Sequence, residues 1–99
     1  MRVDGDWQLT VDGPMGKQDV LVALRQEDGR LSGTVLNKSN NMTTDIFDGS
    51  VDGDQLTWKA KLKLVAMTLT FSTTVQDDKM SGKMKAGLFG SFDVIGERA

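Results

Sequence analysis

The reactive side chains of this chain are carboxylates, lysine amines and hydroxyls, because its 99 residues include neither histidine nor cysteine. Without histidine the chain lacks the usual proton shuttle at neutral pH and the commonest metal ligand. Without cysteine it has no disulfide and no thiolate ligand for a metal. The remaining route to catalysis is a pair of carboxylates that face each other across a cleft.

Only one carboxylate is expected to face such a cleft. Alternation predicts that Asp45 points inward from its strand, near one rim of the fold. A single carboxylate is not an acid–base pair. The glycine-rich stretch 87–90 precedes an expected strand, whereas a phosphate-binding loop precedes a helix. We therefore predict that the protein is not an enzyme and holds no cofactor.

Acidic side chains gather in the expected turns, and hard cations such as calcium bind clustered carboxylates. The spacing of an EF-hand loop is absent, and aspartate is common in turns because its side chain bonds to the local backbone. We expect no metal site at these residues. The acidic set is Asp4, Asp6, Asp28, Asp52, Asp54, Asp77 and Asp78.

Four lysines, Lys59, Lys61, Lys83 and Lys85, are expected to point outward from neighbouring strands. Proteins that bind single-stranded nucleic acid add aromatic side chains for base stacking, and none interleave with these lysines. We predict no nucleic-acid partner. Residues 1–54 carry five basic and ten acidic side chains, whereas the rest of the chain carries seven and four. The lysines could therefore attract the acidic part of a second copy.

The first six residues lack the apolar region of a signal peptide. The longest apolar run, residues 64–67, is far shorter than the roughly 20 residues of a membrane-spanning helix. These features predict a cytoplasmic protein with no membrane partner. The length of 99 residues predicts one domain, 1–99, with a modest core.

Apolar residues recur at every second position, which is typical of half-buried β-strands. In residues 55–62, for example, every even position is apolar and every odd one polar. The pattern predicts eight short strands and no helix. The parity of the fourth strand holds if no bulge interrupts it. The inward residues predicted along the eight strands are Trp7, Leu9 and Val11; Val20, Val22 and Leu24; Leu31, Gly33 and Val35; Phe47, Gly49 and Val51; Leu56, Trp58, Ala60 and Leu62; Met67, Leu69, Phe71 and Val75; Met80, Gly82 and Met84; and Phe92 and Val94.

Short turns such as Asp28-Gly29 join the strands, so the chain is expected to form an antiparallel meander. A sheet with one buried face must close on itself or pack against another layer, and closure also removes its exposed edges. The outward face is polar, unlike the lipid-facing surface of a membrane barrel. We predict an all-β fold, an eight-stranded antiparallel up-and-down β-barrel. A flattened two-sheet sandwich with the same strand order is the alternative.

Two ends of the sequence resemble a known family. Gly5-Asp6-Trp7 at the first strand, with Arg98 at the end of the last, resembles the Gly-x-Trp and terminal arginine of the calycin barrels, which include lipocalins, avidins and fatty-acid-binding proteins. The resemblance implies that Trp7 plugs one end of a calycin-like barrel and that Arg98 packs over it. The wider pattern is also similar to small uncharacterised bacterial barrel domains, some of them fused to hydrolases.

In an up-and-down barrel, alternate loops lie at opposite ends. The loops around 13–16, 37–43, 63–65 and 87–90 share the end away from the termini, and they contain apolar residues, which is unusual for loops. This predicts a mouth that binds a small apolar or amphipathic ligand. The expected ligand-binding residues are Met15, Met42, Leu64, Val65, Leu88 and Phe89 at the rim, Trp58 inside, and Asp45 to orient a polar head group.

The same pattern is typical of a barrel with no cavity. The interior of an eight-stranded barrel is just wide enough to be filled by its own side chains. Large inward residues alternate with glycine and alanine along these strands, as tight packing also requires. The alternative function is therefore a protein-interaction module, or a self-associating homodimer, with a fully packed core and no ligand.

Overall fold

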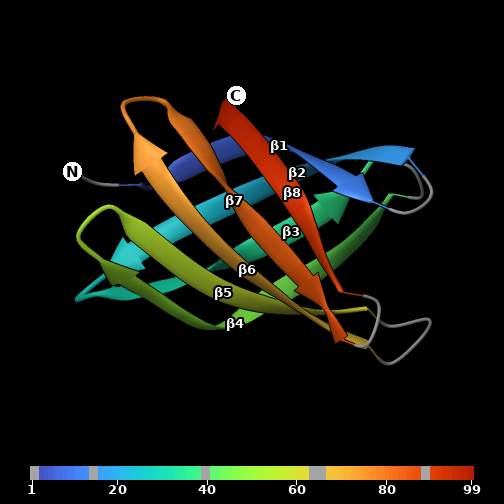
Figure 1. Cartoon of the computed structure of the whole chain (residues 1–99). Coiled ribbons are helices and arrows are strands. Elements are labelled where there is room, and N and C mark those ends of the chain that lie inside the picture. Colours follow the sequence, from blue (N-terminus) through green and yellow to red (C-terminus); the bar gives the residue numbers. More distant parts are fainter. Residues whose placement is uncertain (1–2, 14–15, 39–40, 63–66, 88–89) are drawn as a thin grey trace.

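The computed structural model is a closed barrel in which eight antiparallel strands follow one another around the ring (Figure 1). It describes residues 3–13, 16–38, 41–62, 67–87 and 90–99. Pairing of β8 with β1 completes the ring, which confirms the up-and-down barrel and decides against the sandwich. The strands are β1 (Gly5–Gly13), β2 (Gly16–Glu27), β3 (Arg30–Asn37), β4 (Met42–Asp52), β5 (Gln55–Leu62), β6 (Met67–Gln76), β7 (Lys79–Ala86) and β8 (Ser91–Arg98).

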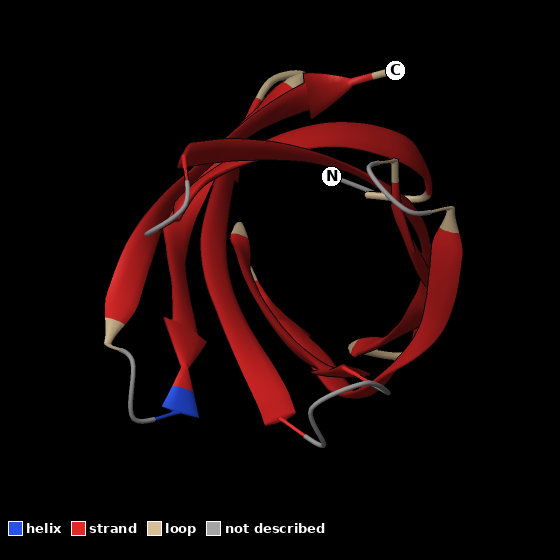
Figure 2. Ribbon diagram, turned by 90° about the vertical axis from the view of Figure 1, so that its right-hand side faces the viewer, coloured by secondary structure: helices blue, strands red, loops and turns tan. Residues whose placement is uncertain are grey.

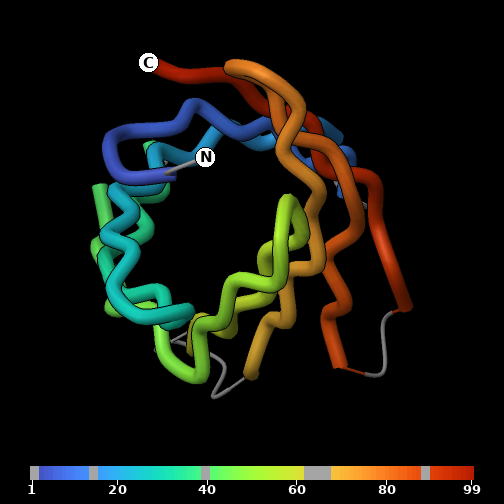
Figure 3. The backbone as a smooth tube through the Cα atoms, turned by 90° about the vertical axis from the view of Figure 1, so that its left-hand side faces the viewer, coloured from blue at the N-terminus to red at the C-terminus, as the bar shows by residue number. Residues whose placement is uncertain are grey.

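Views along the barrel show the strands curving around a common interior (Figure 2; Figure 3). β1 begins and β8 ends at the end of the barrel that also carries the turns after β2, β4 and β6. We call this end the turn end. The turn between β2 and β3 has two residues, Asp28 and Gly29, with φ of +51° and +77°. Positive φ at both positions is what a type I′ hairpin needs, so the Asp-Gly signal predicts this turn correctly.

The buried side chains come from alternate positions of the strands, as the period of two predicts. In β1, Trp7, Leu9 and Val11 are buried, and in β5 Leu56, Trp58 and Ala60 are buried. One hydrophobic cluster lies inside the barrel. Its fully buried large members are Trp7, Trp58, Phe71, Leu9, Leu56, Met80, Val22, Val75 and Val94.

The predicted parity of the fourth strand is wrong in its first half. The pairing register of β4 shifts by one residue against both neighbours, between Phe47 and Ser50 on the β5 side. Asp48 has a φ of +50° within this bulge. Because one extra residue reverses which face each side chain takes, Ile46 is buried, whereas Asp45 is exposed and Phe47 is 41% exposed.

Two inward glycines allow neighbouring strands to approach closely. A Cβ atom on Gly82 would lie 2.0 Å from the carbonyl oxygen of Ser72, and one on Gly96 would lie 2.8 Å from the carbonyl oxygen of Gln8. No side chain fits at either position without moving the backbone. The missing Cβ atoms let β7 approach β6 and β8 approach β1 in a barrel this small.

Candidate functional site

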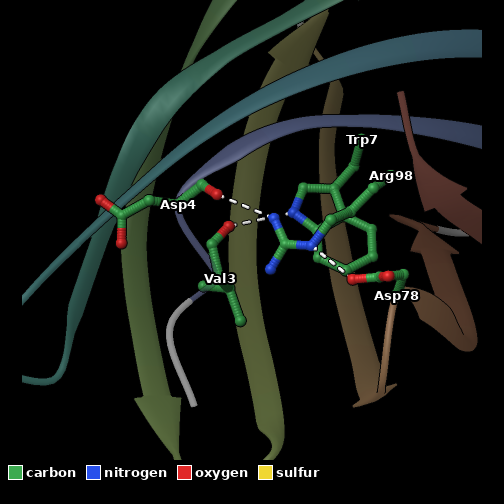
Figure 4. Close-up of polar contacts among 5 residues, drawn as sticks. All are labelled: Val3, Asp4, Trp7, Asp78 and Arg98. Atoms are coloured by element: carbon green, nitrogen blue, oxygen red, sulfur yellow. Dashed lines mark hydrogen bonds and ion pairs between the residues drawn. The ribbon is translucent and has the colours of Figure 1, made fainter.

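Figure 4 shows Trp7 and Arg98, the residues of the predicted seal of the turn end. Trp7 is fully buried, and it pairs with Arg98 across the β1–β8 ladder. The guanidinium carbon of Arg98 lies 4.5 Å from the centroid of the Trp7 ring. A cation over an indole face is attracted by the ring quadrupole, and the attraction strengthens when the pair is shielded from water. The two residues named by the calycin resemblance therefore lie against each other.

Hydrogen bonds tie the start of the chain over this seal. The indole Nε1 of Trp7 donates to the carbonyl oxygen of Val3 at 3.0 Å. Arg98 donates from Nη1 to the carbonyl oxygen of Asp4 and from Nε to Oδ1 of Asp78, both at 2.9 Å (Figure 4). These polar groups of Trp7 and Arg98 thus have hydrogen-bond partners, as buried polar groups in native proteins usually do.

The middle of the interior is aromatic. Trp58 of β5 and Phe71 of β6 are paired across the ladder, and their rings stack at 5.1 Å between centroids with 12° between planes. Trp58 is fully buried, inside the barrel as the sequence predicts. In the next inward position of β6, between Phe71 and Val75, lies Thr73, which is only 3% exposed. It is the one polar side chain among the buried residues that the structure describes.

Two polar atoms in this interior have no hydrogen-bond partner within the described part of the chain: Nε1 of Trp58 and Oγ1 of Thr73. A buried donor or acceptor left without a partner costs roughly 1–3 kcal/mol, so native interiors contain few of them. Thr73 is not among the residues predicted to line the interior. The signal that identifies it is strand parity, because a threonine two residues from both Phe71 and Val75 shares their inward face.

The other predicted ligand-binding residues have different outcomes. Asp45 is exposed, so the prediction that it points inward to orient a head group is wrong; the β4 bulge is the cause. Met42 begins β4 and is half-buried. The remaining rim residues lie outside the described residues: Met15, Leu64, Val65, Leu88 and Phe89.

The outer surface of β5 and β7 carries the predicted lysines, and two of the four are paired within the chain. Lys83 bonds to Asp93 on the adjacent strand, and Lys59 Nζ lies 3.8 Å from Oδ2 of Asp48. Lys61 and Lys85 are exposed. The internal pairs reduce the positive charge that this surface offers to a partner.

An open hollow of about 850 Å³ lies on the outer surface of β1, β6, β7 and β8, toward the turn end. Its lining includes the charged side chains of Asp77, Asp78, Lys79 and Glu97. Ile95 also lines it and is 62% exposed, the most exposed large apolar side chain among the described residues. The hollow therefore combines apolar surface, with Ile95 its exposed apolar side chain, and charged side chains.

Among the described residues, no group of three or more acidic side chains is placed to hold a metal ion. The described part of the chain also contains no helix long and apolar enough to cross a membrane. Comparison with models of protein families and with curated proteins found no match to this chain.

Proposed function

We propose that the protein is a non-enzymatic, calycin-like barrel that takes a small apolar or amphipathic ligand into its interior. The observation that carries the proposal is the pair of buried, unpartnered polar atoms, Trp58 Nε1 and Thr73 Oγ1. An apolar interior with two buried polar groups that lack a partner has the composition of a ligand site, which is mostly hydrophobic with few polar groups. The protein acts in the cytoplasm in this proposal, without a cofactor.

The sealed turn end determines the direction of entry in this proposal. We infer that Trp7 and Arg98 close that end, which their hydrogen bonds to Val3 and Asp4 support, so that a ligand enters from the opposite end, where β1, β3, β5 and β7 finish. The same Trp–Arg arrangement supports the calycin-like assignment. It does so through contacts of these two residues and not through sequence similarity to a known family.

The test is a non-denaturing mass spectrum of the protein purified gently from cells, compared with the same sample after organic extraction. We expect an additional mass that extraction removes and whose size identifies the ligand class. A bare protein in both samples would overturn the proposal.

The second candidate function is self-association, and exposure of Ile95 within a charged hollow favours it. An apolar side chain surrounded by charged groups resembles the centre and rim of a small protein interface.

Ile95→Thr keeps a β-branched residue and removes the apolar contact. Sedimentation equilibrium should then show a dimer for the parent protein and a monomer for Ile95→Thr. Phe47→Thr is the matched control, because Phe47 is the other exposed large apolar residue described, and it lies outside the hollow. A monomeric parent protein contradicts this candidate.

A further inference from the structure

We propose that the protein forms a two-fold dimer through the outer face of β5–β8, with the turn end of each copy against the opposite end of the other. The opposite end of this face carries Lys61 and Lys85, and we call it the lysine end. The inference rests on the second candidate function, self-association, and adds the surface and the orientation of the two copies. It is carried by the charges at the two ends of the face and by the hollow at the turn end.

The charge of each end follows from the order of residues along β5 and β7. Each strand begins directly after an acidic residue of a turn, Asp54 before β5 and Asp78 before β7. Each also carries an exposed lysine near its end, Lys61 in β5 and Lys85 in β7. Both strands run away from the turn end, because both are antiparallel to β6. Acidic side chains therefore gather at one end of the face and lysines at the other.

Most of these charges have no partner within one copy. Lys61 and Lys85 form no ion pair in the described part of the chain, whereas Asp78 is paired with Arg98. Three further carboxylates at the turn end form no ion pair with any residue that the structure describes: Asp54, Asp77 and Glu97. These charges are available to a second copy.

The two ends are too far apart to neutralise each other within one copy. Glu97 pairs with Lys79 across the β7–β8 ladder, and Lys85 lies six residues farther along β7, which is about 20 Å in an extended strand. Surface charges are screened over about 10 Å at 0.1 M salt. A second copy turned by 180° about an axis across the strands brings the lysine end of each face onto the turn end of the other. The same contact then forms twice, as in an isologous interface.

The hollow gives the lysine end of the partner copy a place to bind. Its lining includes three acidic residues and Lys79, its one basic residue. Ile95 also lines it and is 62% exposed. A lysine side chain has an apolar stem and a charged amine. A lysine of the partner copy can therefore contact Ile95 through its stem and a carboxylate of the hollow through its amine.

The face is large enough for a stable dimer. A standard interface buries about 800 Å² of each partner. The protein exposes 6210 Å² in total, and β5–β8 form half of the ring of strands. The contact therefore needs roughly one eighth of the surface, which one side of four strands can supply.

Charge reversal at each end of the face tests the inference. The first variant is Lys61→Glu with Lys85→Glu, and the second is Asp54→Lys with Glu97→Lys; all four side chains are exposed. Asp77 stays unchanged, because its φ of +56° is a conformation that lysine rarely adopts. In sedimentation equilibrium we expect a dimer for the parent protein. The dimer of each variant alone should be at least about a hundredfold weaker, because like charges then face each other.

An equimolar mixture of the two variants tests the orientation. In a mixed pair, the unchanged turn end of the first variant meets the unchanged lysine end of the second, and the two reversed ends also carry opposite charges. We expect the mixture to form a dimer with about the affinity of the parent protein.

Lys17→Glu with Arg30→Glu is the matched control. It changes the net charge by the same amount as the first variant, at exposed positions of β2 and β3, which lie opposite β6 and β7 in the ring. Because charges far from the interface are screened, the affinity of this variant should stay within about threefold of that of the parent at 0.15 M salt.

The outcomes separate this inference from the candidate function on which it rests. If the parent protein is a monomer, self-association itself is overturned. If Ile95→Thr dissociates the dimer and neither charge-reversed variant does, self-association stands and the assigned face and orientation are wrong. If the mixture stays monomeric, or assembles beyond a dimer, the two-fold arrangement is wrong.

Discussion

The two tryptophans of this barrel are both fully buried, yet only the indole N–H of Trp7 has a hydrogen-bond partner among the described residues. At the turn end, the Trp7 N–H donates to Val3 and its ring lies under Arg98. In the middle of the interior, the Trp58 ring is stacked on Phe71 while its N–H has no partner among the described residues. A region that only has to hold the fold together leaves no hydrogen-bonding capacity unused. The unused capacity in the middle is what we assign to a ligand.

The largest expected loss of stability is at the turn end. Trp7→Ala removes a fully buried aromatic side chain, the hydrogen bond to Val3 and the contact with Arg98. It should lower the free energy of unfolding by about 3–5 kcal/mol, measured by urea denaturation. A loss under about 1 kcal/mol would show that Trp7 is not a structural plug.

A smaller effect is expected at the other half of the seal. Arg98→Met keeps much of the apolar stem and removes the cation above Trp7 and the hydrogen bonds to Asp4 and Asp78. We expect a loss of about 2 kcal/mol in the same denaturation measurement, because the pair is partly shielded from water. Lys59→Met, which breaks an exposed ion pair, is the control and should cost at most about 1 kcal/mol. Equal losses in the two variants would contradict the assigned role of Arg98.

A matched pair of variants compares the contributions of the two indole N–H groups to stability. Trp7→Phe and Trp58→Phe make the same change of side chain at two fully buried sites. Only the first removes an existing hydrogen bond, the one to Val3. Trp7→Phe should therefore be less stable than Trp58→Phe by about 1–2 kcal/mol in the ligand-free protein. The reverse order of stability would mean that the Trp58 N–H has a partner in solution.

The smallest effect concerns the hydroxyl in the interior. Thr73→Val replaces an unpartnered buried hydroxyl by a methyl group. It should raise the free energy of unfolding of the ligand-free protein by about 1 kcal/mol, and the melting temperature should rise with it. Thr74→Val on the exposed face should change stability by no more than about 0.5 kcal/mol. A clear destabilisation by Thr73→Val would show that the hydroxyl is bonded in the folded protein.

Strand parity predicts most of the barrel from the sequence, because successive side chains of a regular strand point to opposite faces of the sheet. Leu9 and Leu56 are correctly placed inside in this way. The method fails at Asp45 and Phe47, which the bulge around Asp48 turns outward. A bulge depends on how three strands fit together, and the adjacent apolar residues Ile46 and Phe47 leave both parities open in the sequence. The predicted site therefore included Asp45, which is exposed, and did not include Thr73. Strand parity alone was sufficient to place Thr73 inside.

Local features of the sequence are enough to predict an antiparallel all-β chain without the common catalytic groups: the period of the strands, the Asp-Gly turns and the absence of histidine and cysteine. The tertiary structure alone decided which buried polar atoms find partners. Trp7 reaches Val3 because the start of the chain folds over the turn end, while Trp58 faces apolar side chains from other strands. Hydrogen bonds in a closed barrel depend on distances between residues far apart in the chain, and local patterns carry no record of those distances.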